Sequence, residues 1–209
     1  RTPLTSLDGY FQLIEECDNI DDQRRYLDII RERLNSLNEM LEELFTFTKL
    51  KNDSYKLELT DCCMNRILKE AVFSYYDEWK KQGICPDISI TEEMLYISGN
   101  KQGLRRVIQN VIKNALDHGE KNISIKLIRE DNHALLKISN YTEHPENIDL
   151  SHVFERFYKA DVARGRASTG LGLSIAKELV ERMNGDISAR IQGNDFIIEI
   201  KVSLVVQYA

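Results

Sequence analysis

The chain has 209 residues, 42% of them hydrophobic and 30% charged, which is enough apolar material for one or two buried cores. Its 34 acidic residues outnumber the 28 lysines and arginines and leave a formal net charge of -6. This balance argues against nucleic acid as a partner, because phosphate backbones attract basic surfaces. No apolar run approaches the roughly 18 residues of a membrane span. No signal peptide is visible at Arg1, so we expect the sequence to start part-way through a longer protein.

Apolar residues in the first quarter of the chain recur at alternating spacings of three and four, which is typical of a helix with one narrow apolar face. The longer run comprises Leu27, Ile30, Leu34, Leu37, Leu41, Leu44 and Thr48, and a shorter run upstream comprises Leu4, Leu7, Phe11 and Ile14. A polar turn at 18–22 separates the runs, and either Asp21 or Asp22 can cap the second helix. The pattern predicts a helical hairpin.

Two narrow apolar seams cannot enclose a core on their own. Pairing of two hairpins in a four-helix bundle would bury both seams, so we expect a homodimer. A hairpin that folds back onto the globular part of its own chain is the alternative that remains open.

Residues 50–55 are short and polar and are expected to form a linker, after which strand and helix patterns are mixed. The predicted elements are a strand at 56–60, a helix from a cap at Asp61 to a stop at Gly83, strands at 88–90 and 95–98, a helix at 101–118 capped by Asn100, strands at 123–128 and 134–139, a short helix at 153–158, a helix at 171–183, and strands at 186–191 and 196–205. This mixture predicts an α+β sandwich with one helical layer on one largely antiparallel sheet.

A glycine-rich segment at 170–174 opens the last predicted helix. Glycine lets backbone N–H groups approach an anion closely, and a helix N-terminus adds a partial positive charge, so this segment can cradle phosphate. Lys159, Arg164 and Arg166 lie just upstream and could neutralise a triphosphate. An ordinary tight turn preceded by solvated loop cations is the alternative.

Asn110 and Asn114 lie four residues apart on the helix predicted at 101–118 and therefore share one face of it. The core stripe of this helix comprises Leu104, Val107, Ile108, Val111 and Ala115, and both asparagines fall on its flank. Uncharged oxygen ligands suit Mg²⁺, which usually takes one or two protein ligands and completes its shell with phosphates and water. A pair of surface amides is the alternative.

Four segments, in this order, resemble the signature boxes of bacterial sensor histidine kinases. Residues 1–5 resemble the tail of the H box, 110–114 the N box, 153–158 the F box and 170–173 the G2 box. The resemblance spans the whole chain. It implies a dimerisation and histidine phosphotransfer hairpin at 1–50, a linker at 51–55 and a Bergerat-type ATP-binding domain at 56–209.

The resemblance also implies roles for individual residues. Asn114 would hold Mg²⁺, and Asn110 would support the metal and the phosphates. Thr2 falls where the family keeps a residue that positions a water for dephosphorylation of the response regulator. The remaining residues expected to line the ATP site are Phe154 and Phe157 at the base of an ATP lid, Lys159, Arg164, Arg166 and Thr169 in that lid, and Gly170, Leu171 and Gly172 with their backbone N–H groups.

Three departures from the family pattern bear on the site. The phosphoacceptor His is expected upstream of Arg1, since the histidines of this sequence (His118, His133, His144 and His152) all follow the hairpin. The segment 139–144 aligns with the G1 box, but Asn140 replaces the Asp that contacts the adenine amino group and the glycines are missing. An Asn carbonyl can accept the same hydrogen bond. After the N box, Asp117 and His118 replace the usual Lys and Tyr or His, and His118 could still pack over the nucleotide.

The sequence therefore predicts the catalytic region of a two-component sensor histidine kinase, which binds ATP and Mg²⁺ and transfers the γ-phosphoryl to a hairpin His and then to a response-regulator Asp. The resemblance places this region on the cytoplasmic side of a membrane protein whose spans lie upstream. A nucleotide-binding scaffold without phosphotransfer is one alternative. An ATPase of the wider superfamily is another, although Asn110 stands where such enzymes carry a carboxylate base and no residues remain for a transducer domain.

Overall fold

A computed structural model describes residues 3–52, 55–118, 122–158 and 169–205 of the chain. It contains two compact units, Arg1–Thr48 and Lys49–Ala209. Within the described ranges no helix combines the length and the apolar character needed to cross a lipid bilayer.

The first unit is a helical hairpin, as the heptad spacing predicts. Helix α1 spans Pro3–Glu15 and α2 spans Ile20–Leu50, so the last two residues of α2 already belong to the second unit. The side chain of Asn19 caps α2, because its Oδ1 accepts the N–H of Asp21 at 3.0 Å. The expected cap at Asp21 or Asp22 is therefore wrong: both lie inside the first turn, where their charge favours the positive end of the helix.

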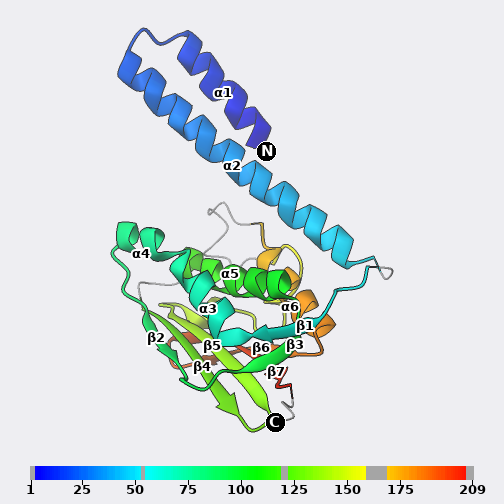
Figure 1. Cartoon of the computed structure of the whole chain (residues 1–209). Coiled ribbons are helices and arrows are strands. Elements are labelled where there is room, and N and C mark those ends of the chain that lie inside the picture. Colours follow the sequence, from blue (N-terminus) through cyan, green and yellow to red (C-terminus); the bar gives the residue numbers. More distant parts are fainter. Residues whose placement is uncertain (1–2, 53–54, 119–121, 159–168, 206–209) are drawn as a thin grey trace. The chain divides into compact units, whose positions relative to one another are not determined.

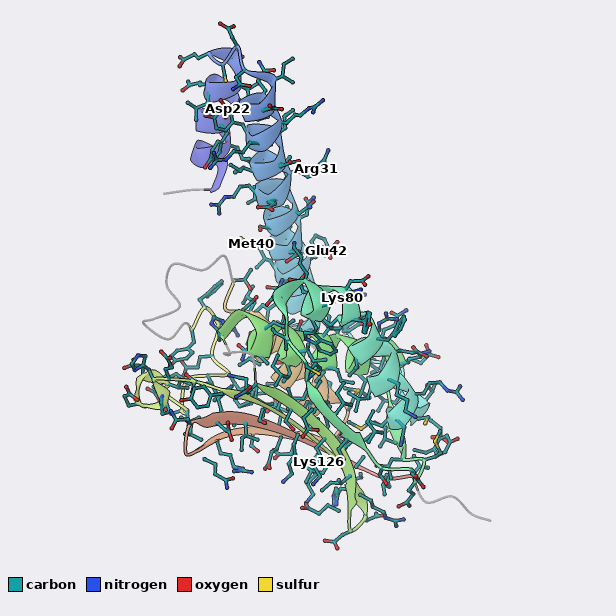
Figure 2. The ribbon with its side chains drawn as sticks, turned by 90° about the vertical axis from the view of Figure 1, so that its left-hand side faces the viewer. Asp22, Arg31, Met40, Glu42, Lys80 and Lys126 are labelled. Carbon is teal, nitrogen blue, oxygen red and sulfur yellow. The ribbon has the colours of Figure 1, made fainter. Side chains whose placement is uncertain are left out.

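Most of the heptad seam is exposed in a single chain. Ile30 is 5% exposed, whereas Leu27 is 51% and Leu41 is 62% exposed. Figure 2 shows Met40 and Glu42 on opposite sides of α2, as their spacing of two residues requires. The apolar stripe of α2 is thus formed but largely uncovered.

The second unit is built on a five-stranded sheet with the order β2-β4-β5-β7-β6. Its strands are β2 (Asp87–Ile90), β4 (Ile123–Glu130), β5 (His133–Tyr141), β6 (Asp186–Gln192) and β7 (Asp195–Ser203). Only the β2–β4 pairing in this sheet is parallel. Strands β1 (Thr60–Cys63) and β3 (Tyr96–Gly99) form a separate antiparallel pair. The helices are α3 (Met64–Phe73), α4 (Tyr76–Gln82), α5 (Lys101–His118) and α6 (Gly172–Arg182), with a short 3-10 helix at Pro145–Asn147.

Helices α3, α5 and α6 lie on one side of this sheet (Figure 1). The predicted core stripe of α5 is buried throughout, with Leu104, Val107, Ile108, Val111 and Ala115 each at most 2% exposed. The other face of the sheet is polar: Lys137 lies opposite Glu199 across the β5–β7 ladder, with a charged-group separation of 2.8 Å. Lys126 also points away from the helices (Figure 2). The predicted sandwich of one helical layer on a largely antiparallel sheet is confirmed.

The strand predicted at 56–60 is wrong. Strand β1 starts only at Thr60, because the four residues of its partner β3 pair with 60–63. The residues before it bond elsewhere, since the carbonyl of Glu58 accepts a hydrogen bond from the side chain of Asn100 at 2.9 Å. Asn100 also caps α5 as predicted, with its Oδ1 accepting the N–H of Gly103 at 2.8 Å.

The single helix predicted up to Gly83 is two helices. Cys63, rather than Asp61, is the N-cap of α3, and the helix breaks at Ser74, whose hydroxyl donates to the carbonyl of Ala71 at 2.6 Å. Such local bonding by serine competes with the helix ladder. Gly83 ends α4 in the left-handed conformation (φ 66°), as a helix stop requires.

The short helix predicted at 153–158 is instead a series of turns. Isolated backbone bonds hold them, such as that from the N–H of Glu155 to the carbonyl of His152 at 2.8 Å. Phe157 adopts a positive φ of 60°, which no right-handed helix accommodates.

Candidate functional site

A hydrogen bond joins the two motifs that the sequence separates by 62 residues. The side-chain N–H of Asn110 on α5 donates to the carbonyl of Gly172, the first residue of α6, at 2.9 Å. Helices α5 and α6 lie side by side in Figure 1 and pack against each other. The amide face of α5 and the start of α6 therefore form one local surface.

The first turn of α6 lacks a side-chain cap among the described residues. Leu171 precedes the helix in a right-handed conformation. The hydroxyl of Ser174, which could have done so, turns back to the carbonyl of Leu171 at 2.8 Å. Thr169 accepts the N–H of Leu171 on its hydroxyl at 3.1 Å, so the N–H groups that face outward begin at Gly172. These are the orphan donors that phosphate uses at helix N-termini.

The chain closes on itself just before this turn. The N–H of Phe157 donates to the carbonyl of Gly170 at 3.0 Å, and both residues have positive φ, 60° and 71°. A Cβ on Gly170 would lie 2.8 Å from the Cα of Phe157 and 2.9 Å from the carbonyl oxygen of Tyr158. Only glycine fits a position with both constraints. Phe157 and Gly170, which flank segment 159–168, are thereby held together.

The two F-box phenylalanines differ in their surroundings. Phe154 is partly buried, and the ammonium group of Lys177 on α6 lies 5.7 Å from its ring centroid. Phe157 is 66% exposed and contributes through its backbone. Phe154 contacts α6 through its ring, whereas Phe157 contacts Gly170, just before α6, through its backbone.

The remaining described candidates lie on α5 and β5, which pack against each other. Asn114 and His118 follow Asn110 at intervals of four residues and are partly buried. Asn140 is 4% exposed near the end of β5, and its side-chain N–H reaches only the neighbouring carbonyl of Tyr141, at 3.3 Å. Asn140 is thus a buried polar side chain in a strand whose other buried residues are apolar. Thr2, Lys159, Arg164 and Arg166 lie outside the described residues.

A polar cluster that the sequence analysis missed precedes the F box. The imidazole Nδ1 of His152 lies 2.7 Å from Asp149 Oδ2, its Nε2 lies 3.9 Å from Glu155 Oε1, and its ring stacks on that of Tyr158. The hydroxyl of Tyr158 accepts the N–H of Asp149 at 2.8 Å. The hydrogen bond and the charge of Asp149 raise the pKa of His152, and the hydroxyl of Ser151, followed by His152, lowers the pKa of Asp149. The spacing of three residues from Asp149 to His152 and from His152 to Glu155 is the sequence feature that could have predicted this cluster.

Two protein-family descriptions match the chain. "His Kinase A (phospho-acceptor) domain" matches residues 1–53, and "Histidine kinase-, DNA gyrase B-, and HSP90-like ATPase" matches residues 99–204. The second match covers more than half of the chain.

Relatives and solved structures agree with these matches. The chain is 31% identical over 91% of its length to sensor histidine kinase YcbM of Bacillus subtilis and 30% identical over 98% to sensor protein VanS of Enterococcus faecium. It spans only 63% and 54% of these relatives. The fold is similar to that of Acinetobacter baumannii histidine kinase AdeS (TM-score 0.78, 20% identity, 98% of this chain and 96% of that chain). It is also similar to histidine kinase ThkA, solved in complex with response regulator protein TrrA (TM-score 0.76, 19% identity, 98% and 58%).

Proposed function

Because the chain belongs to the histidine kinase-, DNA gyrase B- and HSP90-like ATPase family, we propose that it is the kinase region of a two-component sensor histidine kinase. The proposed reaction moves the γ-phosphoryl of ATP to a His of the hairpin, upstream of Arg1, and then to an Asp of a response regulator. The observation that carries the proposal is the 2.9 Å bond from Asn110 to Gly172. It joins the proposed metal-binding face of α5 to the phosphate-binding turn of α6.

The described residues fit ATP and Mg²⁺ by the chemistry of their donors. The uncapped first turn of α6 offers N–H groups to phosphate oxygens. The amide oxygen of Asn114, one turn beyond Asn110, suits Mg²⁺, and the buried carbonyl of Asn140 can accept from an adenine amino group. His118, at the end of α5, would pack over the base.

Phosphoryl transfer asks little covalent chemistry of a protein and depends on positioning and charge. Asn110 fixes the direction of the α6 N–H groups by holding the Gly172 carbonyl. The backbone bond between Phe157 and Gly170 holds the base of the lid, from which Lys159, Arg164 and Arg166 would offset phosphate charge. When bound, Mg²⁺ neutralises charge that develops on the transferred group. Thr2 would orient water when the regulator is dephosphorylated.

The hairpin supplies the partners in this proposal. Its exposed heptad residues, Leu27 and Leu41 among them, would be buried against a second copy in a four-helix bundle. The match to a phospho-acceptor domain supports a response-regulator receiver domain as the second partner. The lengths of the curated relatives support a longer protein, and we propose that it is attached to a membrane, with this region in the cytoplasm.

A phosphotransfer assay on the naturally longer protein tests the proposal. We expect radiolabelled γ-phosphate to become attached to the protein with the acid lability of phosphohistidine, and to pass to a receiver domain. Asn110→Ala should slow this labelling, because the α6 N–H groups lose their fixed direction. ATP binding without labelling would instead indicate a regulatory scaffold, and steady release of inorganic phosphate without labelled protein would indicate an ATPase.

A further inference from the structure

The C-terminal end of α6 holds the segment through which the chain enters the second unit. The guanidinium group of Arg182 donates through Nη1 to the carbonyl of Tyr55 at 2.8 Å and through Nη2 to the carbonyl of Leu50. Leu50 is the last residue of α2. One side chain thus bonds both ends of the segment 50–55, more than 120 residues away in sequence.

A carboxylate on the same helix completes this arrangement. Glu178 accepts from Nε of Arg182 at 3.0 Å and from the ammonium group of Lys51 at 2.6 Å. Burial raises the pKa of Glu178, but the hydrogen bonds from Lys51 and Arg182 outweigh it and hold the pKa below its ordinary value. The carboxylate is therefore charged when it orients Arg182. We call Arg182, Glu178 and Lys51, with the two carbonyls, the α6 clamp.

The arginine and the glutamate of the clamp are largely buried, whereas the side chain of Lys51 is 45% exposed. The side chains of Arg182 and Glu178 are 22% and 18% exposed, and Leu50 is 2% exposed. A guanidinium is a planar fork with fixed donors, which suits two acceptors at once, whereas an ammonium group is a point charge. Charge-assisted bonds of this kind are stronger than neutral ones, so the clamp can hold the entry segment against α6.

Helix α6 connects the clamp to the proposed nucleotide site. Its first residue, Gly172, is fixed by Asn110, and its last residue is Arg182. At 1.5 Å per residue these ends are about 15 Å apart along one rigid helix. The clamp therefore ties the entry segment to the same helix that begins at the proposed phosphate-binding turn.

We propose that Arg182 and Glu178 are positioning residues for phosphoryl transfer to the hairpin. They touch neither nucleotide nor acceptor. By fixing the entry segment to α6 they restrict the orientations of the nucleotide-binding unit, which raises the effective concentration of the γ-phosphoryl at the acceptor. This inference rests on the proposed kinase function, and it adds residues that none of the four signature boxes contains.

The test uses the natural full-length protein with Arg182→Ala, Arg182→Lys and Glu178→Gln. Arg190→Ala is the matched control, because the guanidinium of Arg190 also donates to more than one acceptor, the side chains of Gln192 and Glu199, but lies on the sheet. We expect Arg182→Ala to lower the maximal rate of autophosphorylation about tenfold with KM for ATP within about twofold. Arg182→Lys and Glu178→Gln should be intermediate, and the control should match wild type.

Amide hydrogen exchange tests the clamp independently of the proposed kinase activity. The N–H groups of Asn52 and Tyr55 bond to the carbonyls of Lys49 and Asn52, and their exchange should accelerate in the Arg182 variants. Wild-type protein without phosphotransfer would refute the proposed function. Active wild type with an unchanged or increased rate in Arg182→Ala would refute the clamp as a positioning device. Should Arg182→Ala melt at a much lower temperature than wild type, Glu178→Gln, which keeps the shape of the side chain, gives the same decision.

Discussion

Adding a single methyl group at Gly170 should show whether the close backbone contact with Phe157 holds the base of the proposed lid. With φ at 71°, an alanine pays about 1–2 kcal/mol for the left-handed conformation. Its Cβ would also lie 2.8–2.9 Å from the backbone of Phe157 and Tyr158. Backbone atoms cannot rotate away as a flexible side chain can, so the bond between Phe157 and Gly170 must open, at a further cost of about 0.5–1.5 kcal/mol. The two costs add to about 1.5–3.5 kcal/mol.

Gly193 provides a matched control, and Gly172 provides a comparison within the proposed site. Gly193 has a φ of 61° with no atom within 4 Å of a built Cβ, so Gly193→Ala measures the conformational cost alone. Gly172 has no positive φ, and its Cβ would meet Asn110 at 3.8 Å, an ordinary contact. Gly172→Ala should therefore leave the fold intact. Because the new methyl would lie beside Asn110, at the proposed binding site, we expect it to weaken nucleotide binding.

The assay is amide exchange at Phe157 together with urea unfolding of each variant. Gly170→Ala should accelerate exchange at the Phe157 amide by at least about tenfold relative to Gly193→Ala, since 1.4 kcal/mol corresponds to a factor of ten. ATP affinity should fall in Gly170→Ala and stay unchanged in Gly193→Ala. Equal exchange at Phe157 in the two variants would show that the close contact does not hold the lid base, and would refute this reasoning.

Further predictions concern the metal, the assembly and pH. Asn114→Ala should abolish the Mg²⁺-dependent part of ATP binding, measured by calorimetry with and without the metal, because it removes the proposed amide ligand; an unchanged affinity would exclude that role. Leu37→Asp should shift the hairpin from dimer to monomer in sedimentation, since an unpaired charge in a bundle core costs several kcal/mol (about 3–5), whereas a monomeric wild type at high micromolar concentration would favour the folded-back hairpin. The pKa of His152 lies above 6.5 because of Asp149, so its pairing is complete below pH 6.5 and is lost as pH rises through the raised pKa. NMR titration of the imidazole should show Asp149→Asn returning this pKa toward 6.5, and an unmoved pKa would contradict the assigned cause.

Elements that depend on local chemistry could be predicted from the sequence. Helix α5 has the predicted bounds Lys101–His118, because its core stripe repeats at the helical period and Asn100 supplies the cap. The start of β1 could not be predicted in the same way. Leu57 and Leu59 alternate with polar residues, but the ladder that would make them a strand is absent from the described partner β3, whose four residues pair with 60–63. Whether a segment of alternating apolar and polar residues forms a strand depends on a pairing strand that is distant in sequence.

The candidate site also has a part that could be predicted from the sequence and a part that could not. Side chains with distinctive chemistry, such as those of Asn110 and Asn114, could be chosen from the sequence, because their spacing places them on one helix face. Their hydrogen-bond partners could not be predicted from the sequence. Asn110 reaches the carbonyl of Gly172, and Arg182 reaches those of Leu50 and Tyr55. Every residue carries a backbone carbonyl, so an acceptor of this kind leaves no mark in the sequence.

This difference explains why the sequence does not single out Arg182, although its guanidinium bonds Glu178, Tyr55 and Leu50 in the structure. In the pattern of α6 it is one more cation in the last turn, where a favourable interaction with the helix dipole is a sufficient account. The fold gives Arg182 a specific role, because it brings the carbonyls of Leu50 and Tyr55 within hydrogen-bond reach of the guanidinium. The signature boxes identify the groups that would contact ATP. The residues that join this site to the rest of the chain bond mainly to backbone, and they become visible only when the chain is folded.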